Sequence, residues 1–140
     1  MIAIASDHAG YELKEKLKKH LEEKGFEYRD FGTYSAESCD YPVFAKKACN
    51  AVISGECEKA VLVCGTGIGV SMAANKIKGI RAAVCSDTYS AKYTRLHNNA
   101  NALCMGARVI GEGLAAEITD IFLTTPFEGG KHQRRIDMFE

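Results

Sequence analysis

The chain has 140 residues, of which 46% are apolar and 26% charged, a balance that fits one packed domain and argues against disorder. Eighteen basic and eighteen acidic residues give a formal net charge of zero. This lack of surplus positive charge disfavours non-specific binding to nucleic acid or to an anionic membrane. We therefore expect any anion to bind at a local site.

The sequence also argues against membrane insertion and export. The longest uncharged stretch, residues 60–75, contains three glycines and is shorter than the roughly 20 apolar residues of a spanning helix. Residues 1–7 lack the basic region of a signal peptide. We therefore expect a cytoplasmic protein whose six cysteines are reduced and mostly buried. No two of them have Cys-x-x-Cys spacing, so the sequence predicts no metal site.

The first part of the chain predicts two strands and two helices. Residues 2–6 form a short apolar run, and leucines then recur every fourth residue from 13 to 21 among charged side chains. This spacing predicts an amphipathic helix that ends at Gly25. Residues 26–31 alternate apolar and polar as a strand does. Pro42 suits the first turn of a helix that runs to about residue 53.

The rest of the chain continues the alternation. Residues 60–64 are uncharged and rich in β-branched side chains, which predicts a strand buried on both faces. A glycine-rich turn and a short helix to about residue 78 follow, then strands at 80–85 and 102–105 and helices at 88–98 and 112–123. Beyond Pro126 we expect a tail over residues 127–135 and then a short helix, either a frayed end or an arm that docks elsewhere. The whole pattern predicts a parallel sheet with helices on both faces.

Ligands of parallel sheets bind at the carboxyl ends of the strands, close to helix N-termini. Polar and small residues of this sequence gather at these positions. His97 and Asn98 close the helix before the fifth strand, and we expect His97 to share this edge with His8. The residues that follow a strand directly are Asp7, His8, Cys64, the glycine loop at 65–69, Ser86, Asp87, Gly106 and Arg108.

The glycine loop, with Gly65, Gly67 and Gly69, is the most informative motif. Glycines let the backbone approach a ligand and direct several N–H groups toward an anion. The loop lacks the lysine of a nucleotide-triphosphate P-loop. A dinucleotide site, with Asp87 as the ribose-binding acid, is an alternative, although its fingerprint places the last glycine one position later. A tight turn without a ligand is the other alternative.

Cys64 is the candidate base or nucleophile, because a helix N-terminus is one of the environments that makes a thiol reactive. A buried structural cysteine is the alternative. A phosphatase loop of the Cys-x5-Arg kind is excluded because Val70 occupies the arginine position.

His8 and His97 are candidate acid–base groups, since imidazole titrates near neutral pH. Asp7 either joins them or only caps the first helix. The basic cluster of the tail is either a solvated end or a set of cations for a phosphate; it comprises Lys131, His132, Arg134 and Arg135.

Seven motifs are spread along the whole chain: Asp7-His8-Ala9-Gly10, Asp40-Tyr41-Pro42, Cys64-Gly65-Thr66-Gly67-Ile68-Gly69, Ala73-Ala74-Asn75-Lys76, Gly79-Ile80-Arg81-Ala82-Ala83, His97-Asn98 and Glu128-Gly129-Gly130-x-His132. Together they resemble one family, ribose-5-phosphate isomerase type B, within a group that includes galactose-6-phosphate isomerase subunits. The resemblance implies a Rossmann-like three-layer α/β/α sandwich with five parallel strands. We expect one domain over residues 1–140 with a C-terminal arm from about 126 to 140.

The resemblance implies an aldose–ketose isomerase of the pentose phosphate pathway that interconverts D-ribose 5-phosphate and D-ribulose 5-phosphate through an enediolate. It implies no cofactor and no metal, and a homodimer or tetramer whose active sites are shared between subunits. Carried over by position, Cys64 is the base and His97 opens the sugar ring. From the chemistry of the reaction, Asp7 is a candidate to assist in ring opening and Thr66 is a candidate to relay a proton between the two oxygens. The implied substrate contacts are Asp7, His8, Gly65, Thr66, Gly67, Ile68, Gly69 and Asn98, with Arg108, Lys131 and Arg135 on the phosphate.

Two positions refine the resemblance. One branch of the family has a glutamate where this chain has Val70, so the chain resembles the cysteine branch. Many members have arginine where Lys131 stands, and lysine lacks the bidentate fork. The sequence leaves open a six-carbon substrate, allose 6-phosphate or galactose 6-phosphate, and a non-catalytic module that binds a nucleotide or sugar phosphate.

Overall fold

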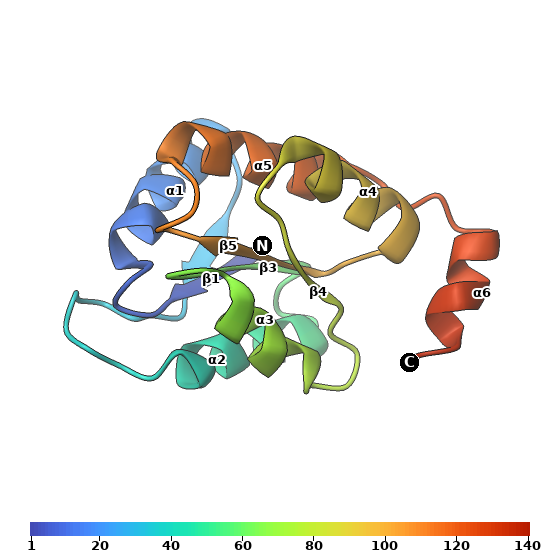
Figure 1. The fold of residues 1–140 in the computed structure, drawn as a ribbon, viewed down its shortest axis with the longest axis horizontal. Helices are drawn as coiled ribbons and strands as arrows, with labels where there is room; N and C mark the ends of the chain where they lie inside the picture. The colour runs from blue at the N-terminus through green and yellow to red at the C-terminus, as the bar shows by residue number, and fades with distance from the viewer.

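A computed structural model describes residues 1–140 and shows a five-stranded parallel sheet between two layers of helices (Figure 1). The strands are β1 (Ile2–Ser6), β2 (Tyr28–Asp30), β3 (Lys59–Cys64), β4 (Ala82–Val84) and β5 (Ala102–Gly106). The helices are α1 (Tyr11–Glu23), α2 (Tyr41–Ile53), α3 (Ile68–Asn75), α4 (Thr88–Asn98), α5 (Glu112–Thr124) and α6 (Lys131–Asp137). None of these helices combines the length and apolar character needed to cross a membrane.

The strand order is β2-β1-β3-β5-β4, and every neighbouring pair is parallel. From β1 the chain first moves to one side, to β2, and later returns to the other side, to β3. The topological switch point therefore lies between β1 and β3. In open α/β sheets the ligand crevice lies at this point, outside the carboxyl ends of the strands.

The two faces of the sheet carry separate apolar cores. On one face, alternate residues of β1 and β3 such as Ile4 and Val61 pack with α1, α4 and α5. On the other face, Ala5, Leu62 and Cys64 pack with α2 and α3. Figure 1 shows α1, α5 and α4 above the sheet and α2 and α3 below it. The prediction that residues 60–64 are buried on both faces is confirmed.

The structure differs from the predicted elements mainly at the edges of the sheet. The strands predicted at 26–31 and 80–85 are reduced to the three residues of β2 and of β4. Both are edge strands, which have a hydrogen-bonded neighbour on one side only. The predicted tail is also helical earlier than expected, because α6 begins at Lys131 and therefore includes the basic residues. Figure 1 shows α6 projecting beside the end of α4.

A buried ion pair fixes the segment that follows β2. The side chain of Lys14 is fully buried, and its Nζ donates to Asp30 Oδ1 at 2.7 Å and to the Thr33 carbonyl. Lys18 donates to the second carboxylate oxygen at 2.9 Å. Burial alone would raise the pKa of Asp30, but the hydrogen bonds from Lys14 and Lys18 hold it below its ordinary value. Asp30 therefore favours folding in its charged form.

Replacing this carboxylate tests the pair. We expect Asp30→Asn to lower the free energy of unfolding at neutral pH by about 3 kcal/mol. The buried Lys14 charge then loses its hydrogen-bonded counter-ion and keeps only Glu15, whose Oε2 lies 3.9 Å away. The lowered pKa contributes its full stability above about pH 4 and loses it as the pH falls through the folded-state value. The difference in free energy of unfolding between the parent protein and Asp30→Asn should therefore become smaller in acid. Urea unfolding between neutral pH and about pH 3 measures this difference, with Glu23→Gln on the exposed face of α1 as the control. A difference that does not change with pH would contradict the stabilising role of the charged Asp30 carboxylate.

Candidate active site

The carboxyl ends of the three central strands lie side by side and hold the loops that follow them together. The Asp7 N–H donates to the Val63 carbonyl at 3.2 Å, which joins the end of β1 to the end of β3. The Ala107 N–H donates to the Cys64 carbonyl at 2.9 Å and the Arg108 N–H to the Gly65 carbonyl at 3.0 Å. Asp7, Cys64, Gly65 and Arg108 are thus neighbours at the switch point, as the sequence predicts.

The Cys64 sulfur accepts a hydrogen bond from the backbone of its own loop. Cys64 is the last residue of β3, and the Gly67 N–H donates to its Sγ at 3.1 Å. Gly67 is the N-cap of α3 and has φ 81°. A backbone donor and the N-terminal end of a helix both stabilise negative charge on sulfur. The side chain is only 5% exposed in a single chain.

The other buried thiols have surroundings that favour the neutral form. Burial raises the pKa of Cys49 to about 12 and that of Cys85 to about 11. Burial also raises the pKa of Cys57 and holds that of Cys104 well above its ordinary value. None of these four sulfurs accepts a backbone N–H as Cys64 does. All six cysteines are free. Five of them are buried, which confirms the prediction that most of the six are buried.

Three glycines let the loop pack against its neighbours. A Cβ on Gly67 would lie 2.9 Å from the backbone carbon of Met105, and one on Gly106 would lie 2.6 Å from that of Thr66. A Cβ on Gly69 would lie 2.7 Å from the ring of Tyr41 at the start of α2. The loops after β3 and β5 are therefore in backbone contact. This packing is incompatible with side chains at these positions and directs the exposed residues Thr66 and Ile68 outward.

Asp7 and His8 occupy the turn between β1 and α1. Asp7 is buried, and its Oδ1 accepts the N–H of Gly10, the N-cap of α1, at 3.0 Å. The proposed capping role of Asp7 is therefore present, and it uses one of the two carboxylate oxygens. His8 Nδ1 accepts the Cys39 N–H at 3.2 Å. A neutral His8 consequently carries its proton on Nε2, which is a hydrogen-bond donor toward other groups.

The expectation that His97 and Asn98 lie at the carboxyl edge is wrong for a single chain. Helix α4 begins at Thr88, next to the carboxyl end of β4, and runs back to Asn98, just before β5 begins. Its last residues therefore lie at the opposite, amino edge of the sheet (Figure 1). There Asn98 lines a cavity of about 550 Å³ formed with the start of β4 and the chain's last residues. A connecting helix of a parallel sheet must return to the edge where the next strand starts.

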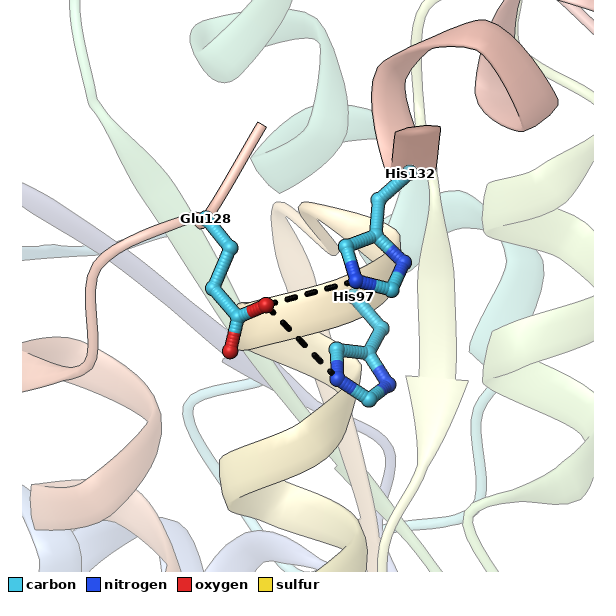
Figure 2. A group of neighbouring side chains, drawn as sticks. All are labelled: His97, Glu128 and His132. Carbon is cyan, nitrogen blue, oxygen red and sulfur yellow. Dashed lines mark ion pairs between the residues drawn. The ribbon is translucent and has the colours of Figure 1, made fainter. Parts of the chain in front are cut away.

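His97 instead belongs to a group that sequence reasoning did not assemble. His97 Nε2 lies 4.0 Å from Glu128 Oε2, and His132 Nε2 lies 3.3 Å from the same oxygen. The two imidazole rings are stacked, with centroids 4.1 Å apart. Figure 2 shows both rings turned toward Glu128. In the sequence, the spacing of four residues between Glu128 and His132 is the feature that could have indicated this group.

The arm that carries the basic residues is fixed to the end of α4. Arg95 Nε donates to the Thr125 carbonyl at 3.1 Å, and the Glu128 N–H donates to the Leu96 carbonyl at 3.1 Å. Lys131 and Arg135 then lie exposed on α6. They are separated from Arg108, which lies beside Gly65 at the other edge. One chain alone does not bring the three predicted phosphate-binding cations together.

Asp87 has a structural role. It is the N-cap of α4, where its Oδ1 accepts the Ser90 N–H at 2.6 Å. This backbone hydrogen bond lowers the pKa of Asp87. Because the Asp87 carboxylate already caps α4, the structure gives no support to the dinucleotide alternative. That alternative needs this carboxylate to bind a ribose.

Gly67 allows a direct test of the loop. We expect Gly67→Ala to lower the free energy of unfolding by about 2 kcal/mol, since alanine is strained at positive φ and its Cβ meets the Met105 backbone. Gly67→Ala should also displace the N–H group that donates to Cys64 Sγ, and so reduce any activity that depends on this sulfur. Gly113→Ala in α5 is the matched control, because a Cβ there meets nothing within 4 Å. Equal stabilities of the two variants in urea unfolding would contradict the close packing.

The whole chain matches known proteins. A model of the ribose/galactose isomerase family matches residues 2–139. Ribose-5-phosphate isomerase B of Escherichia coli is 48% identical over 136 residues, which are 97% of this chain and 91% of that protein. The structure of Clostridium thermocellum ribose-5-phosphate isomerase B superposes with a TM-score of 0.97 and 50% identity, covering 98% of this chain and 93% of that one.

A third similarity includes a ligand. The structure of Mycoplasma genitalium ribose-5-phosphate isomerase B with bound ribulose-5-phosphate has a TM-score of 0.93 and 44% identity, covering 98% of this chain and 91% of that one. The fold, the order of the motifs and these matches over nearly all residues agree. This chain therefore belongs to the ribose/galactose isomerase family and is an aldose–ketose isomerase.

Proposed function

We propose that this enzyme interconverts D-ribose 5-phosphate and D-ribulose 5-phosphate by proton transfer, with Cys64 as the base. The observation that carries the proposal is the hydrogen bond from the Gly67 N–H to Cys64 Sγ at the switch point of the sheet. The names of the E. coli, C. thermocellum and M. genitalium proteins support the five-carbon substrate.

The reaction moves a carbonyl from C1 to C2 without net oxidation. The Cys64 thiolate takes the proton from C2 of the open-chain aldose, and the electron pair of that C–H bond forms the enediolate double bond. Thr66, which is exposed at the loop, relays a proton between O1 and O2. The thiol then returns its proton to C1, which yields the ketose and restores the thiolate.

The enediolate oxygen needs hydrogen-bond donors, which the glycine loop supplies. The first N–H groups of a helix have no partner within the helix. Those that follow Gly67 lie at the start of α3, next to the Cys64 sulfur. One such donor lowers a transition-state barrier by about 3 kcal/mol. Gly65, Gly67, Ile68 and Gly69 are therefore substrate-binding residues in this proposal.

The remaining substrate contacts divide between the two edges of the sheet. Asp7 and His8 lie with Cys64 at the carboxyl edge, and Arg108 beside Gly65 provides one cation for the phosphate. His97 and Asn98 end α4, and Lys131 and Arg135 are on α6. The end of α4 and α6 lie away from this edge, toward the amino ends of the strands (Figure 1). His97 is our candidate for opening the sugar ring, assisted by the free carboxylate oxygen of Asp7.

In our proposal, a second copy of the chain brings these two sets of substrate contacts together. In a homodimer, or a tetramer built from such dimers, the arm and the end of α4 of one copy lie at the carboxyl edge of the other. Three exposed apolar residues, Met72 on α3, Val84 on β4 and Tyr89 on α4, support an interface beside the edge strand β4. The fold then functions as one domain of 140 residues whose arm reaches its partner. The six free cysteines fit a reducing cytoplasm.

Removal of the thiol tests the base. We expect Cys64→Ala to reduce kcat on ribose 5-phosphate by about 100-fold or more, while calorimetry still detects binding of the sugar phosphate. Cys57→Ala, which removes another buried sulfur from the opposite end of β3, should keep kcat close to that of the unaltered enzyme. Turnover of Cys64→Ala within a few-fold of the parent would reject the base.

The same assay should include six-carbon substrates. Allose 6-phosphate and galactose 6-phosphate, assayed in parallel, measure whether the pentose is preferred. A protein that binds these sugars but converts none of them would be a binding module, and the proposed function would be wrong.

Mixed assemblies test the shared site. We expect Cys64→Ala and His97→Asn chains to be nearly inactive alone, and to regain about a quarter of full activity when unfolded and refolded together. Random pairing makes half of the dimers mixed, and one of the two sites in each is then intact. Cys64→Ala refolded with Cys64→Ser is the control and should regain nothing. If both mixtures stay inactive, Cys64 and His97 do not act in one site across two copies.

A further inference from the structure

We propose that His97, Glu128 and His132 form a binding site for a divalent transition-metal ion such as Zn²⁺, and that the bound ion inhibits the isomerase by occupying His97. Each residue offers one ligand atom, and the three atoms lie within 4.8 Å of one another. Two imidazole nitrogens and one carboxylate oxygen are a donor set that zinc binds in proteins. The inhibitory part of the proposal rests on the proposed role of His97 in ring opening.

The separations are close to those that coordination requires. Tetrahedral zinc with bonds of 2.0–2.2 Å places its ligand atoms about 3.4 Å apart. His132 Nε2 already lies 3.3 Å from Glu128 Oε2, and His97 Nε2 lies 4.0 Å from it. These two separations need little contraction, and the two imidazole nitrogens lie within 4.8 Å of each other. A fourth position remains for water or substrate.

The backbone brings the three ligands together before any ion binds. His97 is in the last turn of α4, and Glu128 is held there by the bond from its N–H to the Leu96 carbonyl. His132 is the second residue of α6 and follows Glu128 by four residues, across the turn at Gly129 and Gly130. Figure 2 shows the ligands on these three segments. This ordering reduces the conformational entropy that ion binding would otherwise cost.

Binding requires one ring to turn. The imidazole planes are 12° from parallel and their centroids are 4.1 Å apart. A single ion therefore cannot lie in the plane of both rings at once. The His97 side chain is 39% exposed, whereas that of His132 is 12% exposed. His97 is therefore the ring that turns toward the ion, away from its stack on His132 and its edge contact with Tyr93.

The coordinated ring cannot act as an acid or a base, because its Nε2 lone pair is bound to the ion. Cyclic ribose 5-phosphate, which needs ring opening, should then react more slowly. Protons compete with the ion for the imidazole nitrogens, so the affinity should fall as the pH is lowered.

The four histidines of the chain make a direct readout possible. We would titrate the intact enzyme with Zn²⁺ and follow the imidazole signals by NMR, with the affinity from calorimetry. The signals of His97 and His132 should change together and saturate at one ion per chain, while those of His8 and His20 stay in place. His20 is the internal reference because it also contacts a carboxylate, that of Asp120 at 2.8 Å, but has no second imidazole beside it.

Variants assign the ligands. Glu128→Gln and His132→Gln should each weaken Zn²⁺ binding by roughly tenfold or more, and His20→Gln should not change it. Inhibition, measured as the ratio of rates with and without Zn²⁺ in each protein, should decrease in the first two variants only. Unchanged His97 and His132 signals, or inhibition that persists in both variants, would overturn the site and place the ion elsewhere, with Cys64 the first candidate.

Binding without inhibition has a different meaning. If Zn²⁺ perturbs His97 and His132 but the rate on cyclic substrate stays the same, the inhibitory role is wrong. The ring-opening function of His97 then fails with it, whereas the base function of Cys64 is still decided by Cys64→Ala.

Discussion

The hydrogen bond from the Gly67 N–H to Cys64 Sγ depends on the backbone conformation of Gly67 and on the strands around it. It requires Gly67 to adopt a left-handed conformation, and the backbone of β5 leaves no room for a side chain there. It also requires the strand order that places Cys64 between the ends of β1 and β5. Cys49, Cys57 and Cys104 lie in the same core as Cys64, and Cys85 lies in the core on the other face. Burial raises the pKa values of these four thiols. Position at the strand end, more than residue type, distinguishes Cys64.

The carboxyl edge could be predicted from sequence because its residues follow their strands directly. Asp7, Cys64 and Arg108 each come within two residues of a strand end, so the topology alone brings them together. The contacts that shape the loop could not be predicted, since Tyr41 reaches Gly69 from a different helix. The buried Lys14 was likewise invisible, because in the sequence it is one of several lysines on an amphipathic helix.

The position of His97 shows where sequence reasoning failed. The prediction treated a residue near a strand in sequence as a residue near the site, but His97 precedes the start of β5 and follows no strand end. The distinction matters because the two edges of a sheet are different surfaces. The group of His97, Glu128 and His132 joins segments that are 35 residues apart, counted from His97 to His132, and only the folded arm brings them together.

The proposed acid–base groups Cys64 and His97 lie at opposite edges of the sheet. If one catalytic centre is built from two copies, as we propose, it exists only while the copies remain associated. Specific activity should then decline when the preparation is diluted below the dissociation constant of the assembly. Substrate that contacts both copies would hold them together, so the sugar phosphate itself would protect the enzyme against loss of activity on dilution.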